Sequence, residues 1–208
     1  MSNQASQAKQ PVSAALAGPY GHPFHPMLVT VPIGAWVASL VFDIASLIVS
    51  KPGFLVQGAE WLIAIGVLGA LAAAMVGFLD MFAIPTGTPA FRTALLHMSL
   101  NLAVTVAYGV NFAWRFGFSS DGNAVGTWQL VLSAVSLATL AGSGYLGGKL
   151  AYRYGVRVAD EVTQAEGFAK DRDPGQARHS KTAALPSTTP AANNPKDQSV
   201  RPAVHTNR

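Results

Sequence analysis

Histidine and aspartate side chains are the residues in this sequence whose type and spacing point most directly to chemistry. His22 and His25 each precede a proline at the start of the first apolar stretch, and His97 lies near the start of the third. Asp80 falls near the end of the second stretch, so all four side chains are expected at one end of the protein. Imidazole and carboxylate groups bind metal ions, haem iron or protons. The sequence therefore predicts a binding site at that end.

A second group of polar residues is expected at the opposite end. Asp43 lies far along the first apolar stretch, and Tyr108 and Asn111 lie at a similar depth in the third. Asn101 shares a helical face with these two residues and with His97. Ionisable groups within a membrane are costly and normally face the interior of a helical bundle. The polar faces of the first and third stretches are therefore predicted to meet inside the bundle.

No residues are predicted to be catalytic. A nucleophile, base and acid do not occur in a recognisable arrangement, and the serines of the fourth stretch are expected to bond to carbonyl groups of their own helix. The chain contains no cysteine, which excludes disulfides, thiolate-bound iron–sulfur clusters and thiol nucleophiles. We therefore expect a non-enzymatic protein.

The elements that must position these side chains are four apolar stretches. Only 12% of the 208 residues are charged, whereas soluble domains are about one-quarter charged. Each stretch has the roughly 20 apolar residues that a helix needs to cross a bilayer. The predicted spans are residues 27–49, 61–84, 93–114 and 127–148. Since the connections are short, the prediction is an all-α integral membrane protein, a four-helix up-down-up-down bundle.

The segments on either side of the bundle are polar. Residues 1–20 and 159–208 lack the apolar content to form a core and are predicted to be disordered, which leaves 21–158 as the membrane domain. Basic residues are more numerous on the side of the termini, with Lys9, Arg92, Lys149, Arg153 and Arg157 against Lys51 and Arg115 on the other. Positive residues are retained in the cytoplasm, so both termini are predicted to be cytoplasmic.

Partners follow from composition and from small residues. The net charge of +4 is dispersed and does not indicate nucleic-acid binding. The expected partner is the lipid bilayer. Small residues at four-residue spacing, such as Gly69, Ala73 and Gly77, let helices approach closely. They would serve packing within the bundle and a homodimer equally well.

Several motifs together resemble a family of bacterial membrane proteins, the domain of unknown function 2231. They are the run His22–Gly34 with Asp43 after it, Asp80, His97 with Asn101, and the run Gly147–Val158. The resemblance covers about residues 20–158 and implies a four-helix protein of the bacterial inner membrane. Some members of that family are joined to a Rieske-type iron–sulfur domain, which suggests a redox setting and a redox partner.

Three interpretations of the polar residues remain open. His97 with His25 or His22 would supply two axial nitrogens to a haem b, in an electron-transfer or quinone-linked subunit. Alternatively, His22, His25, Asp80 and His97 offer ligands to a divalent metal ion in a small transporter or sensor, with Asp43, Tyr108 and Asn111 extending a proton path. In the third interpretation the polar groups only tie the helices together.

One specific contact is also predicted. Asp80 and His97 flank the second connection, each about one turn from the same membrane surface. A carboxylate at that depth needs a partner, and the imidazole is the nearest candidate. Such a pair would hold the second and third helices in register and orient the ring of His97 toward His25.

Overall fold

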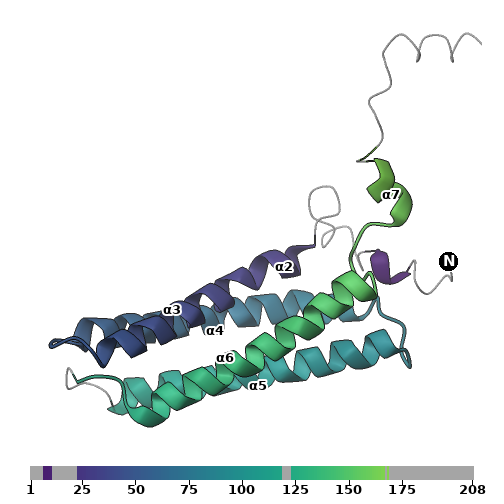
Figure 1. Cartoon of the computed structure of the whole chain (residues 1–208). Helices are drawn as coiled ribbons and strands as arrows, with labels where there is room; N and C mark the ends of the chain where they lie inside the picture. The colour runs from purple at the N-terminus through teal and green to yellow at the C-terminus, as the bar shows by residue number, and fades with distance from the viewer. Residues whose placement is uncertain (1–6, 11–22, 119–122, 167, 169–208) are drawn as a thin grey trace, which may run out of the picture. The chain divides into compact units, whose positions relative to one another are not determined.

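The computed structural model describes residues 7–10, 23–118, 123–166 and 168. His22 lies outside these residues, as do most of the segments 1–20 and 159–208 that were predicted to be disordered. The helices are, in chain order, α2 (Phe24–Leu28), α3 (Thr30–Ser46), α4 (Gly53–Met81), α5 (Pro89–Phe118), α6 (Thr127–Gly148), the π-helical turn η3 (Lys149–Arg153) and α7 (Glu161–Glu166) (Figure 1). The described residues contain no strand, which confirms the predicted all-α class.

Within the described ranges, four helical segments are long and apolar enough to cross a membrane, as predicted. They are Phe24–Ser46, Gly53–Met81, Pro89–Phe116 and Thr127–Arg153. α6 has the predicted bounds of the fourth span, whereas α4 begins at Gly53, before the predicted residue 61, and the first helix ends at Ser46, before residue 49. These differences arise because the predicted bounds mark the apolar part of each segment, which lies in the hydrocarbon. A helix instead ends where its backbone hydrogen bonds end.

The first span is interrupted at Val29, between α2 and α3. Pro32 has no N–H to donate to the carbonyl of Leu28, so the hydrogen-bond ladder is broken at this point. His25 lies within α2, not in the extended conformation that its position before Pro26 predicts. Proline is tolerated in the first turn, where its missing N–H would have no helical partner. His25 is thus placed on a short helical segment of its own.

The long helices form a closed ring. α3 packs chiefly on α4, α5 packs on α6, and the two hairpins join through α4 with α5 and α3 with α6 (Figure 1). α3 and α5 are consequently diagonal to each other and face one another across the bundle axis. Trp36, Ile63, Val104 and Tyr108 form the main core there.

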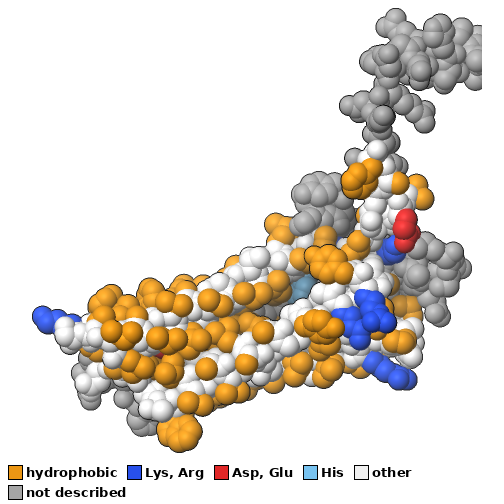
Figure 2. Space-filling view, viewed as in Figure 1, with side chains coloured by type: hydrophobic (Ala, Val, Ile, Leu, Met, Phe, Trp, Pro, Cys, Tyr) orange, Lys and Arg blue, Asp and Glu red, His pale blue; other side chains and the backbone are white. Residues whose placement is uncertain are grey.

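The outside of the bundle is apolar, and its two ends differ in charge. Exposed aliphatic and aromatic side chains cover the helices, which suits contact with lipid (Figure 2). Lys and Arg side chains gather at the end where α6 finishes (Figure 2). Lys51 is exposed at the other end. A small second core of Ile84, Ala94 and Leu150 closes the basic end, where the α4–α5 connection meets η3.

Candidate functional site

Three pairs of side chains meet across the bundle axis, one from the first span and one from α5 in each pair. The rings of His25 and His97 lie 6.4 Å apart between centroids and are nearly perpendicular. Trp36 and Tyr108 stack at 4.2 Å. Asp43 and Arg115 form an ion pair of 2.6 Å at the far end. At a rise of about 1.5 Å per residue the three layers extend over about 27 Å, close to the hydrocarbon thickness.

We call the end that holds His25 and His97 the histidine end and the opposite end the ion-pair end. His25 is held by α4. Its Nδ1 lies 2.8 Å from the carbonyl oxygen of Ala73, and because a carbonyl only accepts, Nδ1 must carry the proton. In the neutral ring, Nε2 therefore carries the lone pair. Gly77 makes room for the ring, since a Cβ there would lie 2.8 Å from two of its atoms.

His97 is held by α6 in the same manner. Its Nδ1 lies 2.8 Å from the carbonyl oxygen of Ser143 and 3.1 Å from the Ser143 hydroxyl. That hydroxyl donates its proton to the carbonyl of His97, so it accepts from Nδ1–H. A Cβ at Gly147 would lie 3.0 Å from the ring. The amide nitrogen of Asn101 is 3.4 Å and 3.2 Å from the two ring nitrogens, a near-equal spacing that places it over the face of the ring.

The two hairpins repeat each other. Asp43 and Arg115 are 72 residues apart in the chain. The same separation relates three further pairs on the first span and α5: His25 and His97, Trp36 and Tyr108, and Ser39 and Asn111. The backbone acceptors repeat as well. His25 and Ala73 are 48 residues apart, and His97 and Ser143 are 46 apart. Trp36 donates to the carbonyl of Ile63, 27 residues on, and Tyr108 donates to that of Ser133, 25 residues on. The histidine pair thus lies on a pseudo-two-fold axis that runs along the bundle.

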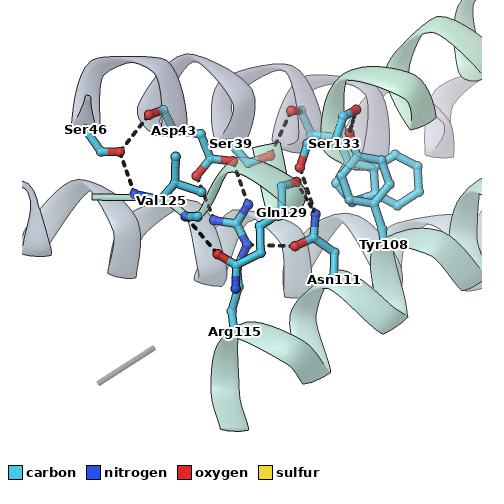
Figure 3. A network of polar contacts seen from close by, with 11 residues as sticks. Ser39, Asp43, Ser46, Tyr108, Asn111, Arg115, Val125, Gln129 and Ser133 are labelled. Atoms are coloured by element: carbon cyan, nitrogen blue, oxygen red, sulfur yellow. Dashed lines mark hydrogen bonds and ion pairs between the residues drawn. The ribbon is translucent and has the colours of Figure 1, made fainter. Parts of the chain in front are cut away.

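The ion-pair end is a saturated polar network (Figure 3). Arg115 donates two hydrogen bonds to the carboxylate of Asp43, at 2.7 Å and 2.6 Å, and neither side chain is exposed. Its Nε donates to the side-chain oxygen of Asn111, whose amide nitrogen donates to Ser133 Oγ and to the carbonyl of Gln129. A buried pair of charges persists only when its remaining polar atoms are bonded in this way. The network therefore fixes α3, α5 and α6 in register.

The loop before α6 is anchored to the same network. Ser46 Oγ donates to the carbonyl of Asp43 and accepts from the N–H of Val125. The N–H of Gly126 donates to the side chain of Gln129, which caps the start of α6. The ion-pair end is closed by these contacts. Its geometry indicates a structural role.

The structure gives Asp80 a partner other than the predicted one. Asp80 Oδ1 lies 3.1 Å from Nε of Arg157, whereas His97 bonds to Ser143. Arg157 reaches Asp80 because the chain turns back after η3 through left-handed conformations at Gly155 and Arg157 itself. Sequence proximity favoured His97, but the long side chain of a residue beyond the fourth span comes closer.

The predicted site residues thus divide into two sets. His25 and His97 come together, Asp43, Tyr108 and Asn111 lie buried toward the ion-pair end, and His22 is outside the described residues. Within the described ranges, no three His, Asp or Glu side chains are grouped so as to hold a metal ion. Arg115 was missed, because it was counted as a surface charge. The sequence did contain a sign that Arg115 is interior, since it lies one turn after Asn111 on the polar face of α5.

The fold and these buried polar layers define a four-span α-helical membrane protein. The sequence profile of the family described as "predicted membrane protein (DUF2231)" matches residues 21–160. The chain belongs to that family, as its motifs suggested. The comparison with curated proteins gave no match, and neither did the comparison with solved structures.

Proposed function

We propose that this chain is a non-enzymatic electron-transfer protein of the bacterial inner membrane that binds a b-type haem between His25 and His97. The observation that carries the proposal is the pair of imidazoles facing each other across the bundle axis, each with its Nδ1 bonded to a backbone carbonyl. Ligating histidines characteristically donate their second N–H in this way, because it fixes the ring and leaves Nε2 to the metal. Helix bundles commonly build cofactor sites from side chains on facing helices.

The spacing of the rings suits coordination to one iron. Two metal–nitrogen bonds of about 2 Å, with about 1 Å from each nitrogen to its ring centre, require ring centres about 6 Å apart. The two centroids are 6.4 Å apart. Gly77 and Gly147 support this position, since each leaves the space that a methyl group would take from the neighbouring ring.

The number of ligands favours haem over a bare metal ion. Zinc is held by three or four protein ligands, and no three His, Asp or Glu side chains are grouped for a metal ion in the part of the chain that the structure describes. A porphyrin supplies four nitrogens itself and asks the protein for two axial ligands. A quinone fits less well, because its carbonyl groups need hydrogen-bond donors and both Nδ1–H groups are already used.

Access to the pair is from the side of the bundle. Both imidazoles are half-buried, and Figure 2 shows a histidine side chain at the surface between α2 and the last turns of α6. A flat, apolar molecule dissolved in the bilayer would approach along this path. The cofactor would then bind with its edge toward lipid.

The distribution of basic residues supports a cytoplasmic location for this site. Because Arg115 is neutralised by Asp43 inside the bundle, Lys51 is left as the basic residue named for the ion-pair end. Five basic residues belong to the histidine end, namely Lys9, Arg92, Lys149, Arg153 and Arg157. Arg157 is likewise paired, with Asp80, so the other four are compared with Lys51. This contrast is stronger than the sequence alone suggested, and it supports cytoplasmic termini.

Optical spectra of the full chain test the proposal. We expect purified protein from haem-replete cells to show a b-type reduced-minus-oxidised spectrum and one haem per chain by pyridine haemochrome. His25→Ala should change the spectrum and His97→Ala should abolish it, whereas His179→Ala, a histidine beyond the family match, should leave it unchanged. Wild-type protein that folds without haem under these conditions would refute the function.

A further inference from the structure

We infer that His25 is an exchangeable ligand and His97 a permanent one, so that the reduced haem binds a diatomic gas in the place of His25. The inference rests on the proposed function and adds a second ligand class to it. It follows from the unequal ways in which the two halves of the repeat hold their histidines.

His97 is held at several points. Its Nδ1–H faces two acceptors on Ser143, the carbonyl and the hydroxyl, and Asn101 covers the face of its ring. The Ser143 hydroxyl also bonds to the backbone carbonyl of His97. His97 stands on the long, uninterrupted helix α5. Moving its ring would break contacts with both the side chain and the backbone of α6.

His25 is held at fewer points. Its Nδ1–H has one acceptor, the carbonyl of Ala73. It stands on α2, a five-residue helix that contains no buried residue. α2 is joined to α3 around Val29, whose N–H donates to the carbonyl of His25 and whose carbonyl accepts from the N–H of Ile33. Pro32 leaves the carbonyl of Leu28 without the next bond of the ladder. Few buried contacts and a broken hydrogen-bond ladder are the properties of segments that open locally at low cost. α2 is therefore the less firmly anchored support of the two histidines, which favours release of the ligand that it carries.

The acceptors of the two Nδ1–H groups differ by one hydroxyl group. Ala73 and Ser143 occupy equivalent positions, because each supplies the carbonyl that accepts from the Nδ1–H of its histidine. Ser143 adds a hydroxyl that Ala73 lacks. A hydrogen bond to Nδ1 strengthens a histidine as a ligand. The ligand on the Ser143 side should accordingly bind iron more tightly.

The exchange is a ligand substitution at ferrous iron. The bond from iron to Nε2 of His25 breaks, Nε2 recovers its lone pair, and a bond from iron to the carbon of carbon monoxide forms. The bond from iron to His97 is retained, and no electron or proton is transferred. Carbon monoxide is a suitable probe because it binds only the reduced state, which added dithionite supplies.

Carbon monoxide binding to the dithionite-reduced full chain tests the inference. In the wild type we expect a shift of the Soret band, at a rate that becomes independent of gas concentration because dissociation of His25 limits it. His25→Ala should keep its haem and bind at least about tenfold faster, with a rate proportional to gas concentration. His97→Ala should lose the haem.

A variant of Ala73 and a control variant refine the test. Ala73→Ser, which gives His25 the hydroxyl that His97 has, should slow exchange several-fold. Gly142→Ala, whose added Cβ meets no atom within 4 Å, is the control and should leave the limiting rate nearly unchanged. Two results would overturn this inference and leave the proposed function intact. One is a six-coordinate wild-type haem that never binds carbon monoxide, and the other is haem that is retained by His97→Ala and lost by His25→Ala. Absence of haem from the wild type would instead overturn the proposed function.

Discussion

Replacing Arg115 by Met should strongly destabilise the bundle, because it leaves the carboxylate of Asp43 buried without its partner. Two hydrogen bonds of 2.6 Å and 2.7 Å join the pair, and neither side chain is exposed. Removing one member of a buried pair costs about 3–5 kcal/mol. The bond from Arg115 Nε to Asn111 is lost as well, which adds about 1 kcal/mol. The expected loss is therefore about 4–6 kcal/mol.

Replacing both members should cost less than replacing either one. In the double variant Asp43→Leu, Arg115→Met, no charge remains buried, so much of the loss should be recovered. The free energy of unfolding would be measured by denaturant titration in mild detergent for the wild type, both single variants and the double variant. Lys51→Met, an exposed basic residue beyond the end of α3, is the control and should change stability by less than about 0.5 kcal/mol.

The double-mutant cycle gives the refuting result. If the ion pair is structural, the two single losses together should exceed the loss of the double variant by several kcal/mol. Strictly additive losses would mean that Asp43 and Arg115 do not interact in the folded protein. The register of α3 against α5 that this ion pair defines would then be wrong.

The remaining predictions concern the histidine end and the topology. Gly77→Ala and Gly147→Ala should each displace the neighbouring imidazole and lower the haem content. Gly142→Ala is the control, because the added Cβ has no atom within 4 Å, and equal haem content in all three variants would show that the rings do not pack on Gly77 and Gly147. In thermal unfolding, the losses of stability caused by Asp80→Asn and Arg157→Gln should be non-additive, because the two residues form an ion pair. The losses caused by Asp80→Asn and His97→Gln should add, and the reverse result would support the Asp80–His97 contact predicted from the sequence. Reporter fusions at Gly53 and Asn123 should be exported, and those at Thr88 or after Arg157 should be cytoplasmic; the opposite result would move the histidines to the other side of the membrane.

The sequence alone was sufficient for the class of fold and for the buried faces. Four long apolar stretches with few charges indicate spanning helices, because a bilayer offers the backbone no hydrogen-bond partner and continuous apolar runs lack the two-residue alternation of barrel strands. The spacing of Trp36, Ser39, Asp43 and Ser46 puts them on one face of a helix, and all four are buried. Helical periodicity is a local property, so it can be read without knowing where the neighbouring helices lie.

The repeat was also present in the sequence but was not recognised there. His25 with Asp43 and His97 with Arg115 have the same spacing, yet apart from the two histidines the equivalent residues on α3 and α5 differ in type. Trp36 corresponds to Tyr108, Ser39 to Asn111 and Asp43 to Arg115. The first and last of these are also contacting pairs. Complementary pairs across an axis need different partners, so this kind of repeat leaves little similarity to detect.

Only the tertiary structure decided which polar groups are partners. Asp80 forms an ion pair with Arg157 and not with His97, which is nearer in sequence, and Arg115 is an interior partner of Asp43 and not a surface charge. His25 and His97 bond to carbonyl oxygens of α4 and α6, which every residue of a helix possesses and no sequence pattern marks. These pairings depend on how far each helix is shifted and rotated against its neighbours. Close packing of glycines and side chains sets that register, and it becomes defined only when all four spans are assembled.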